Sequence, residues 1–281
     1  MKIDKKGEEY IKIIKKGSLK VYLNNYYNYN YFSNKKAFNK LIYIIFIIFI
    51  IICFIFLFCS LIIFKIKDIK QEKLVQELSN FKSFSQCFED LILFCIFYDI
   101  RKGFYIDIGA NDPNIISVTK AFYLRGWYGI NIEPLPNKIQ ELMKYRKRDI
   151  NLQIGVGEKK GIARLFEKES GSTLFKEYSS NNSQILNIHI DTMLNICNKY
   201  LPKKEVVQFC KIDIEGGEKE ALLGYDFENC RPKVFCIEST KPGSYIPTFE
   251  QWENILFKND YSFVYQYEIN RYYSSYLLIF L

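Results

Sequence analysis

The 281-residue chain has little histidine and no cysteine pattern typical of a metal site. Its single histidine, His189, lies in the alternating run LNIHIDT, where we predict a solvent-facing strand residue. The eight cysteines form no CxxC or Cys/His spacing that would hold zinc. The sequence therefore predicts no metal site, and a mechanism that needs a histidine base has no second candidate.

Net charge is also scarce outside the N-terminal part. The chain carries +8, of which residues 1–40 hold +7 and residues 41–83 hold +2, so that residues 84–281 have 24 basic and 25 acidic side chains. Binding to nucleic acid depends on basic side chains that neutralise phosphates. The near-neutral C-terminal part therefore argues against a nucleic-acid partner.

Charge is absent altogether from residues 41–64, where Tyr43 and Ser60 are the only polar interruptions. At ~1.5 Å per residue a helix of this length reaches about 36 Å, enough to cross a hydrocarbon core of ~30 Å. A core helix of a soluble domain would have a polar face, and a cleaved signal peptide would be shorter and would begin nearer the N-terminus. We predict a single transmembrane helix that anchors the chain in a lipid bilayer.

The rest of the chain divides around this run. Residues 1–40 are basic and rich in Asn and Tyr, which predicts a disordered tail whose lysines either contact anionic lipid or only supply flanking charge. Residues 65–83 are predicted to form a polar stalk. Residues 84–281 are long enough for one globular domain.

Within that domain, short apolar runs alternate with amphipathic segments, which is typical of a doubly wound α/β sheet. The predicted strands are 104–108, 129–132, 150–156, 206–214 and 233–238, with 261–267 and 276–280 as a hairpin-like pair. The predicted helices are 85–100, 115–125, 136–145, 192–200, 219–223 and 248–258. Two further strands, 161–167 and 185–190, are expected at one edge of the sheet.

Three of the predicted strands end abruptly in acidic residues. Asp107 lies in GFYIDIGANDP, Glu133 ends YGINIEP, and Asp213 and Glu215 lie in KIDIEGGE. The carboxyl ends of parallel strands meet at one edge of an open α/β sheet, where such sheets bind small molecules. We therefore expect these carboxylates to converge on a single crevice.

The glycine content of the first strand end indicates which ligand this crevice takes. A dinucleotide site needs several glycines beside the pyrophosphate, whereas Gly109 stands alone here, which argues against a nicotinamide oxidoreductase. One glycine suits an adenosine without phosphate, as in S-adenosylmethionine. In this interpretation Gly109 lets the backbone pass close to the cofactor, Asn111 and Asp107 serve its amino-acid portion, and Glu133 accepts its ribose hydroxyls.

Methyl transfer from a sulfonium chiefly requires alignment of the acceptor oxygen and exclusion of water, with a carboxylate to take the hydroxyl proton. Asp213 is the first candidate for that carboxylate and Glu215 the second. Glu218 is a third candidate, or it orients the Gly216-Gly217 turn instead. The alternative for all three is a carboxylate cluster that only holds the turn.

Several motifs occur in an order typical of one family. They are Ser85-Gln86 with Glu89-Asp90, then GFYIDIGANDP, SVTKAFYLRGWYGINIEPLP, RDINLQIGVGEKKG, KIDIEGGEKEALLGYDF, RPKVFCIEST and INRYYSS. From about Ser85 to Ser275 the chain resembles the FkbM family of S-adenosylmethionine-dependent methyltransferases. The resemblance implies a class I, Rossmann-like methyltransferase fold with a seven-stranded, mostly parallel sheet, and O-methylation of a sugar or glycan hydroxyl. A membrane-tethered pseudoenzyme or adaptor that keeps this fold is the alternative.

The orientation in the membrane follows from weaker signals. Five lysines follow the apolar run within about twenty residues and three precede it, which favours a cytosolic C-terminal side, while the whole tail favours the opposite. We read the six cysteines of the domain as unpaired, as in the cytosol, where S-adenosylmethionine is made. We therefore expect a cytosol-facing domain; a luminal one could carry a glycan on Asn181.

Overall fold

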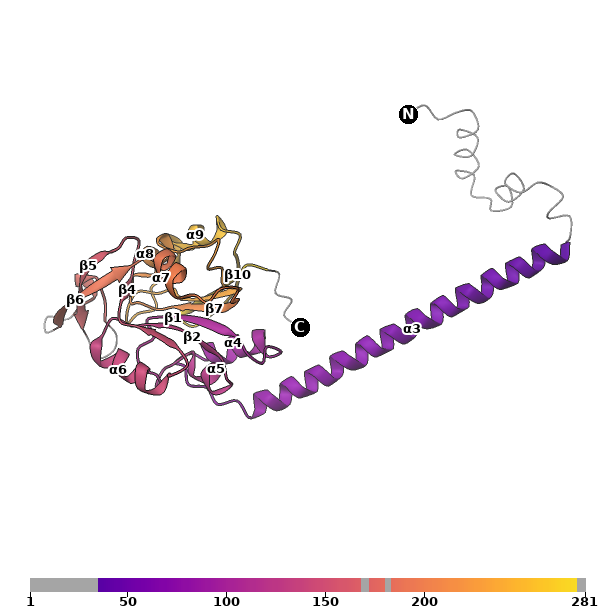
Figure 1. Ribbon diagram of the computed structural model, residues 1–281, viewed down its shortest axis with the longest axis horizontal. Helices are drawn as coiled ribbons and strands as arrows, with labels where there is room; N and C mark the ends of the chain where they lie inside the picture. Colours follow the sequence, from indigo (N-terminus) through magenta and orange to yellow (C-terminus); the bar gives the residue numbers. More distant parts are fainter. Residues whose placement is uncertain (1–34, 168–171, 180–182, 277–281) are drawn as a thin grey trace, which may run out of the picture. The chain divides into compact units, whose positions relative to one another are not determined.

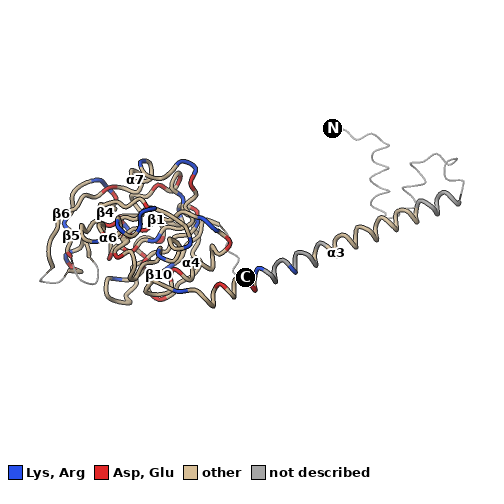
Figure 2. The backbone as a smooth tube through the Cα atoms, turned by 60° about the horizontal axis from the view of Figure 1, so that its bottom comes forward, with Lys and Arg blue, Asp and Glu red and all other residues tan. Residues whose placement is uncertain are grey.

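The computed structural model describes residues 35–167, 172–179 and 183–276 (Figure 1). The chain divides into two compact units, residues 1–75 and 76–281. Most of the predicted tail, residues 1–34, lies outside the described residues. Along the second unit, Lys and Arg interleave with Asp and Glu in the described segments (Figure 2), as its near-neutral composition predicts.

One long helix, α3 (Lys35–Ser79), covers the apolar run and most of the predicted stalk. The side chains of residues 42–58 are exposed along it, whereas those of Leu41, Cys59 and residues 61–64 lie outside the description. When the described residues alone are considered, no helix is sufficiently long and apolar to cross a membrane. The membrane-spanning interpretation of residues 41–64 stays a prediction.

The second unit is built on a seven-stranded sheet with the order β3-β2-β1-β7-β8-β10-β9. Its strands are β1 (Phe104–Ile108), β2 (Tyr128–Ile132), β3 (Ile150–Leu152), β7 (Val207–Ile212), β8 (Val234–Glu238), β9 (Ser262–Tyr267) and β10 (Asn270–Ser274). Strand β10 runs antiparallel to both of its neighbours, and the other pairings in the sheet are parallel. Strands β1, β7 and β8 are buried along their whole length, as expected for parallel strands covered on both faces. The predicted seven-stranded, mostly parallel sheet is confirmed.

The C-terminal hairpin differs from the prediction at its second strand. That strand is β10, whereas the sequence pattern predicts it at 276–280, and residues 277–280 lie outside the described residues. Strand β10 begins with the polar residues Asn270 and Arg271, so its sequence does not indicate a buried strand. Both are buried, and both find partners: Asn270 Nδ2 donates to Glu89 Oε1 at 2.9 Å, and Arg271 pairs with Glu253. Because these polar groups are satisfied, the segment occupies the sheet interior.

A second sheet of three strands has the order β4-β6-β5. Its strands are β4 (Gly155–Val156), β5 (Gly161–Glu167) and β6 (Gln184–Asp191). The predicted strand 150–156 is therefore wrong as one element, since its first half is β3 in the main sheet and its last two residues are β4. The prediction that 161–167 and 185–190 extend an edge of the main sheet is also wrong. These strands pack Leu165, Ile188 and Ile190 into an apolar cluster of their own with Leu135, and His189 is exposed between them as predicted.

Helices lie on both sides of the main sheet, with α7, α8 and α9 on one side and α4, α5 and α6 on the other (Figure 1). They are α4 (Glu89–Phe97), α5 (Lys120–Leu124), α6 (Pro136–Tyr145), α7 (Met193–Tyr200), α8 (Glu218–Leu223) and α9 (Glu253–Phe257), with short 3-10 turns η1 (Lys176–Tyr178) and η2 (Phe249–Gln251). Helices α4 and α5 are shorter than predicted. Phe88 (φ 55°) and Ile116 (φ 54°) adopt left-handed backbone, which interrupts the predicted helices 85–100 and 115–125.

The cysteine prediction is wrong at two of the six positions. Cys197 in α7 and Cys230 before β8 form a disulfide across 33 residues of sequence, and both are buried in the hydrophobic core. The sequence does not indicate this pair, because the two cysteines are far apart along the chain and meet only in the folded structure. Disulfides persist mainly in oxidising compartments, so the argument for a cytosolic domain from unpaired cysteines is lost.

Candidate functional site

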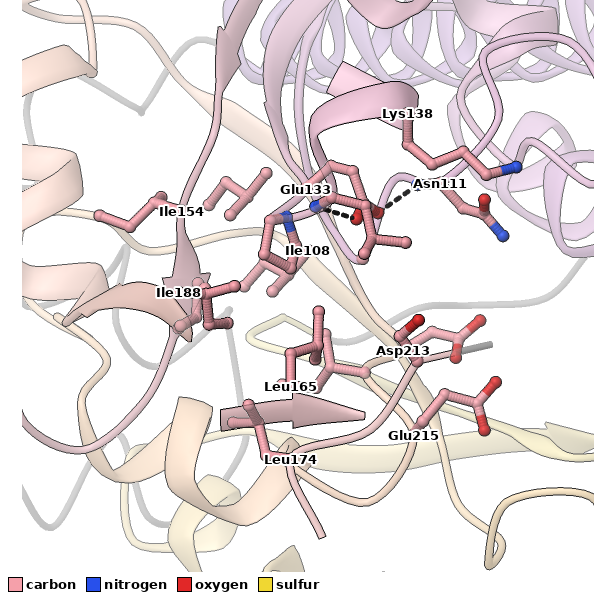
Figure 3. Close-up of a pocket in the computed structure, with 18 of the residues that line it drawn as sticks. Ile108, Asn111, Glu133, Lys138, Ile154, Leu165, Leu174, Ile188, Asp213 and Glu215 are labelled. Carbon is pink, nitrogen blue, oxygen red and sulfur yellow. Dashed lines mark hydrogen bonds between the residues drawn. The ribbon is translucent and has the colours of Figure 1, made fainter. Parts of the chain in front are cut away.

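A pocket opens where β1, β2 and β7 end (Figure 3). Five of the seven predicted site residues line it, namely Gly109, Asn111, Glu133, Asp213 and Glu215. The other two, Asp107 and Glu218, lie outside the lining. The convergence of the strand ends on one crevice is therefore confirmed for most of the predicted residues.

One half of the pocket is apolar. The main sheet supplies Ile108 and Ile132, while the second sheet and its loop supply Leu165, Ile188 and Leu174 (Figure 3). This half of the pocket, the apolar cup, suits a flat apolar heterocycle. The alternation of buried Ile188 and Ile190 with exposed His189 predicts the strand. The sequence interpretation missed that this strand lines the pocket, because that depends on how the second sheet packs.

Glu133 ties the first two strand ends together. Its Oε2 accepts a hydrogen bond from the Asn111 backbone N–H and its Oε1 accepts one from the Leu135 N–H, both at 2.9 Å (Figure 3). Asn111 has left-handed backbone (φ 47°), a strained conformation of the kind that clusters at functional sites. Burial raises the pKa of Glu133 above its ordinary value, although the two backbone bonds oppose that shift. The carboxylate thus lies in the pocket wall, and each oxygen accepts one hydrogen bond from the described residues, which leaves it a further lone pair.

Gly109 lies where the ends of β1 and β7 touch. A Cβ at this position would be 1.9 Å from the backbone oxygen of Asp213, and the φ of +83° is left-handed. Only glycine fits such an approach of two backbones. The close contact brings Asp213 next to the loop that follows β1.

Lys211 is a pocket residue that the sequence interpretation did not select. Its Nζ donates to the Gly109 carbonyl at 2.9 Å and lies 3.3 Å from Asp213 Oδ2 and 3.6 Å from Asp107 Oδ1. Burial acts to lower the pKa of Lys211, but the charges of Asp213 and Asp107 outweigh it and raise the pKa above its usual value. A lysine within an otherwise apolar strand, as in FCKIDIE, is the signal that could have indicated it. Asp107 is buried, and its Oδ1 forms an ion pair with this ammonium group.

Glu218 supports the turn after β7. Its Oε1 accepts hydrogen bonds from the backbone N–H groups of Ile214, at 3.1 Å, and Gly216, at 3.2 Å. Burial raises the pKa of Glu218 to about 7. From the other side, Thr173 Oγ1 donates to the Glu215 carbonyl at 2.8 Å. This arrangement matches the turn-holding alternative for Glu218, while Asp213 and Glu215 remain at the pocket.

The family model for the methyltransferase FkbM domain matches residues 107–263, which include all of these strand ends. The chain belongs to the FkbM methyltransferase family. A comparison with curated proteins gives no match. The resemblance inferred from the motifs is thus confirmed, and with it the methyltransferase class of this FkbM domain.

Acidic and basic side chains line the FkbM pocket together, since Asp213 and Glu215 share it with Lys138 and Lys211. Outside the lining, burial raises the pKa of the Cys87 thiol to about 11, and the charges of Glu89, Glu268 and Asp213 add to the shift. Among the described residues, no group of three or more histidine, cysteine and acidic side chains has a geometry that could hold a metal ion.

Proposed function

We propose that this FkbM domain transfers a methyl group from S-adenosylmethionine to a hydroxyl of a sugar or glycan. The observation that carries the proposal is a single pocket that combines three features. It has an apolar cup, the buried carboxylate of Glu133, which can accept hydrogen bonds, and the carboxylate of Asp213. The resemblance of the motifs to the FkbM family supports a sugar or glycan hydroxyl as the acceptor.

The pocket residues fit the proposed cofactor. The apolar cup would receive the adenine, and the free lone pairs of Glu133 would accept the ribose hydroxyls. Gly109 permits close passage of the backbone, and the exposed side chain of Asn111 is available to the amino-acid portion. Asp107 would act on that portion only through Lys211, because it is buried and forms an ion pair with the ammonium group.

The cofactor supplies an electrophilic methyl group on a sulfonium. In the proposed reaction Asp213, whose side chain is 37% exposed, orients the acceptor hydroxyl and takes its proton as the new O–CH3 bond forms. Glu215 lines the same side and is the second candidate for that role. Positive charge disperses in the transition state, so the main contributions are alignment and exclusion of water.

The proposal is tested by methyl transfer. The full chain is incubated with methyl-tritiated S-adenosylmethionine and with glycan, lipid and protein fractions of its host, and label is expected in the glycan or sugar fraction. Label confined to protein would contradict a sugar acceptor. Binding of cofactor with no label in any fraction would favour the alternative of a tethered adaptor.

Glu133 provides a prediction for the cofactor site. Glu133→Ala should weaken binding of S-adenosylhomocysteine by about 1–3 kcal/mol, the scale of a lost hydrogen bond to a charged group. Because the pKa of Glu133 is raised, affinity should weaken as the pH falls through that raised value, at a higher pH than for an ordinary glutamate. Glu133→Gln is the matched control, since it keeps the volume and cannot titrate. Calorimetry over a pH series measures both effects, and unchanged affinity in Glu133→Ala would remove the residue from the site.

We also propose that residues 41–64 span a membrane. The support is an uninterrupted helix through the apolar run and the exposure of its described side chains. The wild-type chain should stay with the membrane pellet after an alkaline carbonate wash. Paired Ile51→Lys and Phe54→Lys changes should release it, because each lysine costs about 2.5–3.5 kcal/mol at the centre of a span. Ile162→Lys, at an exposed apolar position of the other unit, is the control and should stay in the pellet; release of the wild type would refute the anchor.

For orientation, we propose that the domain faces the cytosol. The lysine counts beside the apolar run and the cytosolic origin of S-adenosylmethionine support this side. The Cys197–Cys230 disulfide argues for the opposite side. Protease treatment of sealed vesicles decides between them: digestion of the C-terminal domain is expected, and protection would place the domain in the lumen.

A further inference from the structure

A second carboxyl group lies beside Asp213, and the sequence interpretation did not select it. Glu238 is the last residue of β8, the parallel neighbour of β7. The register pairs Ile212 with Ile237, so Asp213 and Glu238 occupy the next position on their two strands. Side chains alternate between the faces of a sheet, and neighbouring strands lie ~4.8 Å apart, so these two carboxyls project from the same face at adjacent strand ends.

Glu238 is buried in a way that is unusual for a glutamate. Its exposed fraction is 6%, and its Oε2 has no hydrogen-bond partner among the described residues. A buried carboxylate without partners is costly, whereas the neutral acid is tolerated. Burial therefore raises the pKa of Glu238 to about 11, with the charges of Asp213, Glu218 and Glu215 adding to the shift. Burial thus favours the protonated form of Glu238, which can donate a hydrogen bond.

Asp213 thus lies between two donors. Lys211 Nζ is 3.3 Å from its Oδ2, and Glu238 occupies the adjacent register position at the end of β8. Glu238 does not line the pocket, so it meets neither acceptor nor cofactor directly. Its place suits a residue that acts through Asp213.

We propose that Glu238 is a positioning residue that donates its carboxyl proton to Asp213 and, together with Lys211, fixes the orientation of the Asp213 carboxylate toward the acceptor hydroxyl. The inference rests on the proposed methyl transfer. In that reaction the O–CH3 bond forms, the S–CH3 bond breaks with its electron pair going to sulfur, and the hydroxyl proton passes to Asp213. The two carboxyls hold one proton before transfer and two after it, and Asp213 returns the second to solvent through the pocket.

Two variants of the full chain separate this role from simple packing. Glu238→Gln keeps the volume and the neutral charge and offers an amide N–H donor, so kcat should stay within about 3-fold of wild type. Glu238→Leu removes the donor, so kcat should fall by about 10–100-fold, the value of one hydrogen bond to a charged group. Binding of S-adenosylhomocysteine should change by less than about 2-fold in both variants. The melting temperature of Glu238→Leu should not fall, since an unpartnered buried oxygen is removed.

Each contrary result has a distinct meaning. Wild-type kcat in Glu238→Leu would overturn the role of Glu238 and leave the proposed function intact. Parallel losses of kcat, binding and melting temperature in both variants, with no rescue by glutamine, would reduce Glu238 to a packing residue. A wild-type chain that transfers no methyl group to any fraction would overturn the proposed function, and this inference with it.

Discussion

Asp213→Asn should lower turnover by about 10²–10⁴-fold, the usual contribution of a positioned general base, and leave cofactor affinity nearly unchanged. The change keeps the volume of the side chain and removes its charge. Lys211 retains the Gly109 carbonyl at 2.9 Å and Asp107 at 3.6 Å, so the buried ammonium group is still balanced after the change. The fold at the end of β7 is expected to persist, and the loss should appear in the chemical step.

Methyl transfer to the identified acceptor and calorimetric binding of S-adenosylhomocysteine are measured for each variant. Glu215→Gln is the matched control on the same turn, and it should cost less if Glu215 only supports the acceptor. Full turnover in Asp213→Asn would exclude the residue from the mechanism. Loss of binding together with turnover would place Asp213 in the cofactor site instead.

The site could be predicted at its strand ends because the main sheet obeys local rules. Strands β1, β7 and β8 are short apolar runs buried on both faces, and acidic residues follow where such strands emerge. Glycine at position 109 and the acids at 133 and 213 could therefore be assigned to one crevice from the sequence. The family match over residues 107–263 supports the same assignment.

The features that were missed depend on contacts between distant segments. Strand β10 is polar at its start, and its buried Asn270 finds its partner in Glu89, which lies in α4 far back in the sequence. The Cys197–Cys230 pair likewise forms only when the chain is folded, and so does the part of the apolar cup that the second sheet supplies. Glu238 looks like an ordinary strand-terminal acid until the register places it beside Asp213.

Gly109 also gives a large expected effect, and the chain provides its own control. A Cβ at Gly109 would be 1.9 Å from the Asp213 backbone oxygen, a clash that only movement of β1 or β7 can relieve. At Gly126 the φ of +91° is equally left-handed, but nothing lies within 4 Å of the position of a Cβ. Gly126→Ala should therefore lower the free energy of unfolding only by the backbone penalty of about 1–2 kcal/mol.

Gly109→Ala should lower the free energy of unfolding by that penalty plus the cost of the clash, about 4 kcal/mol or more, and should abolish binding of S-adenosylhomocysteine. Denaturant unfolding of the two variants beside the wild type measures the difference; equal losses of unfolding free energy would show that the backbones of β1 and β7 do not approach this closely.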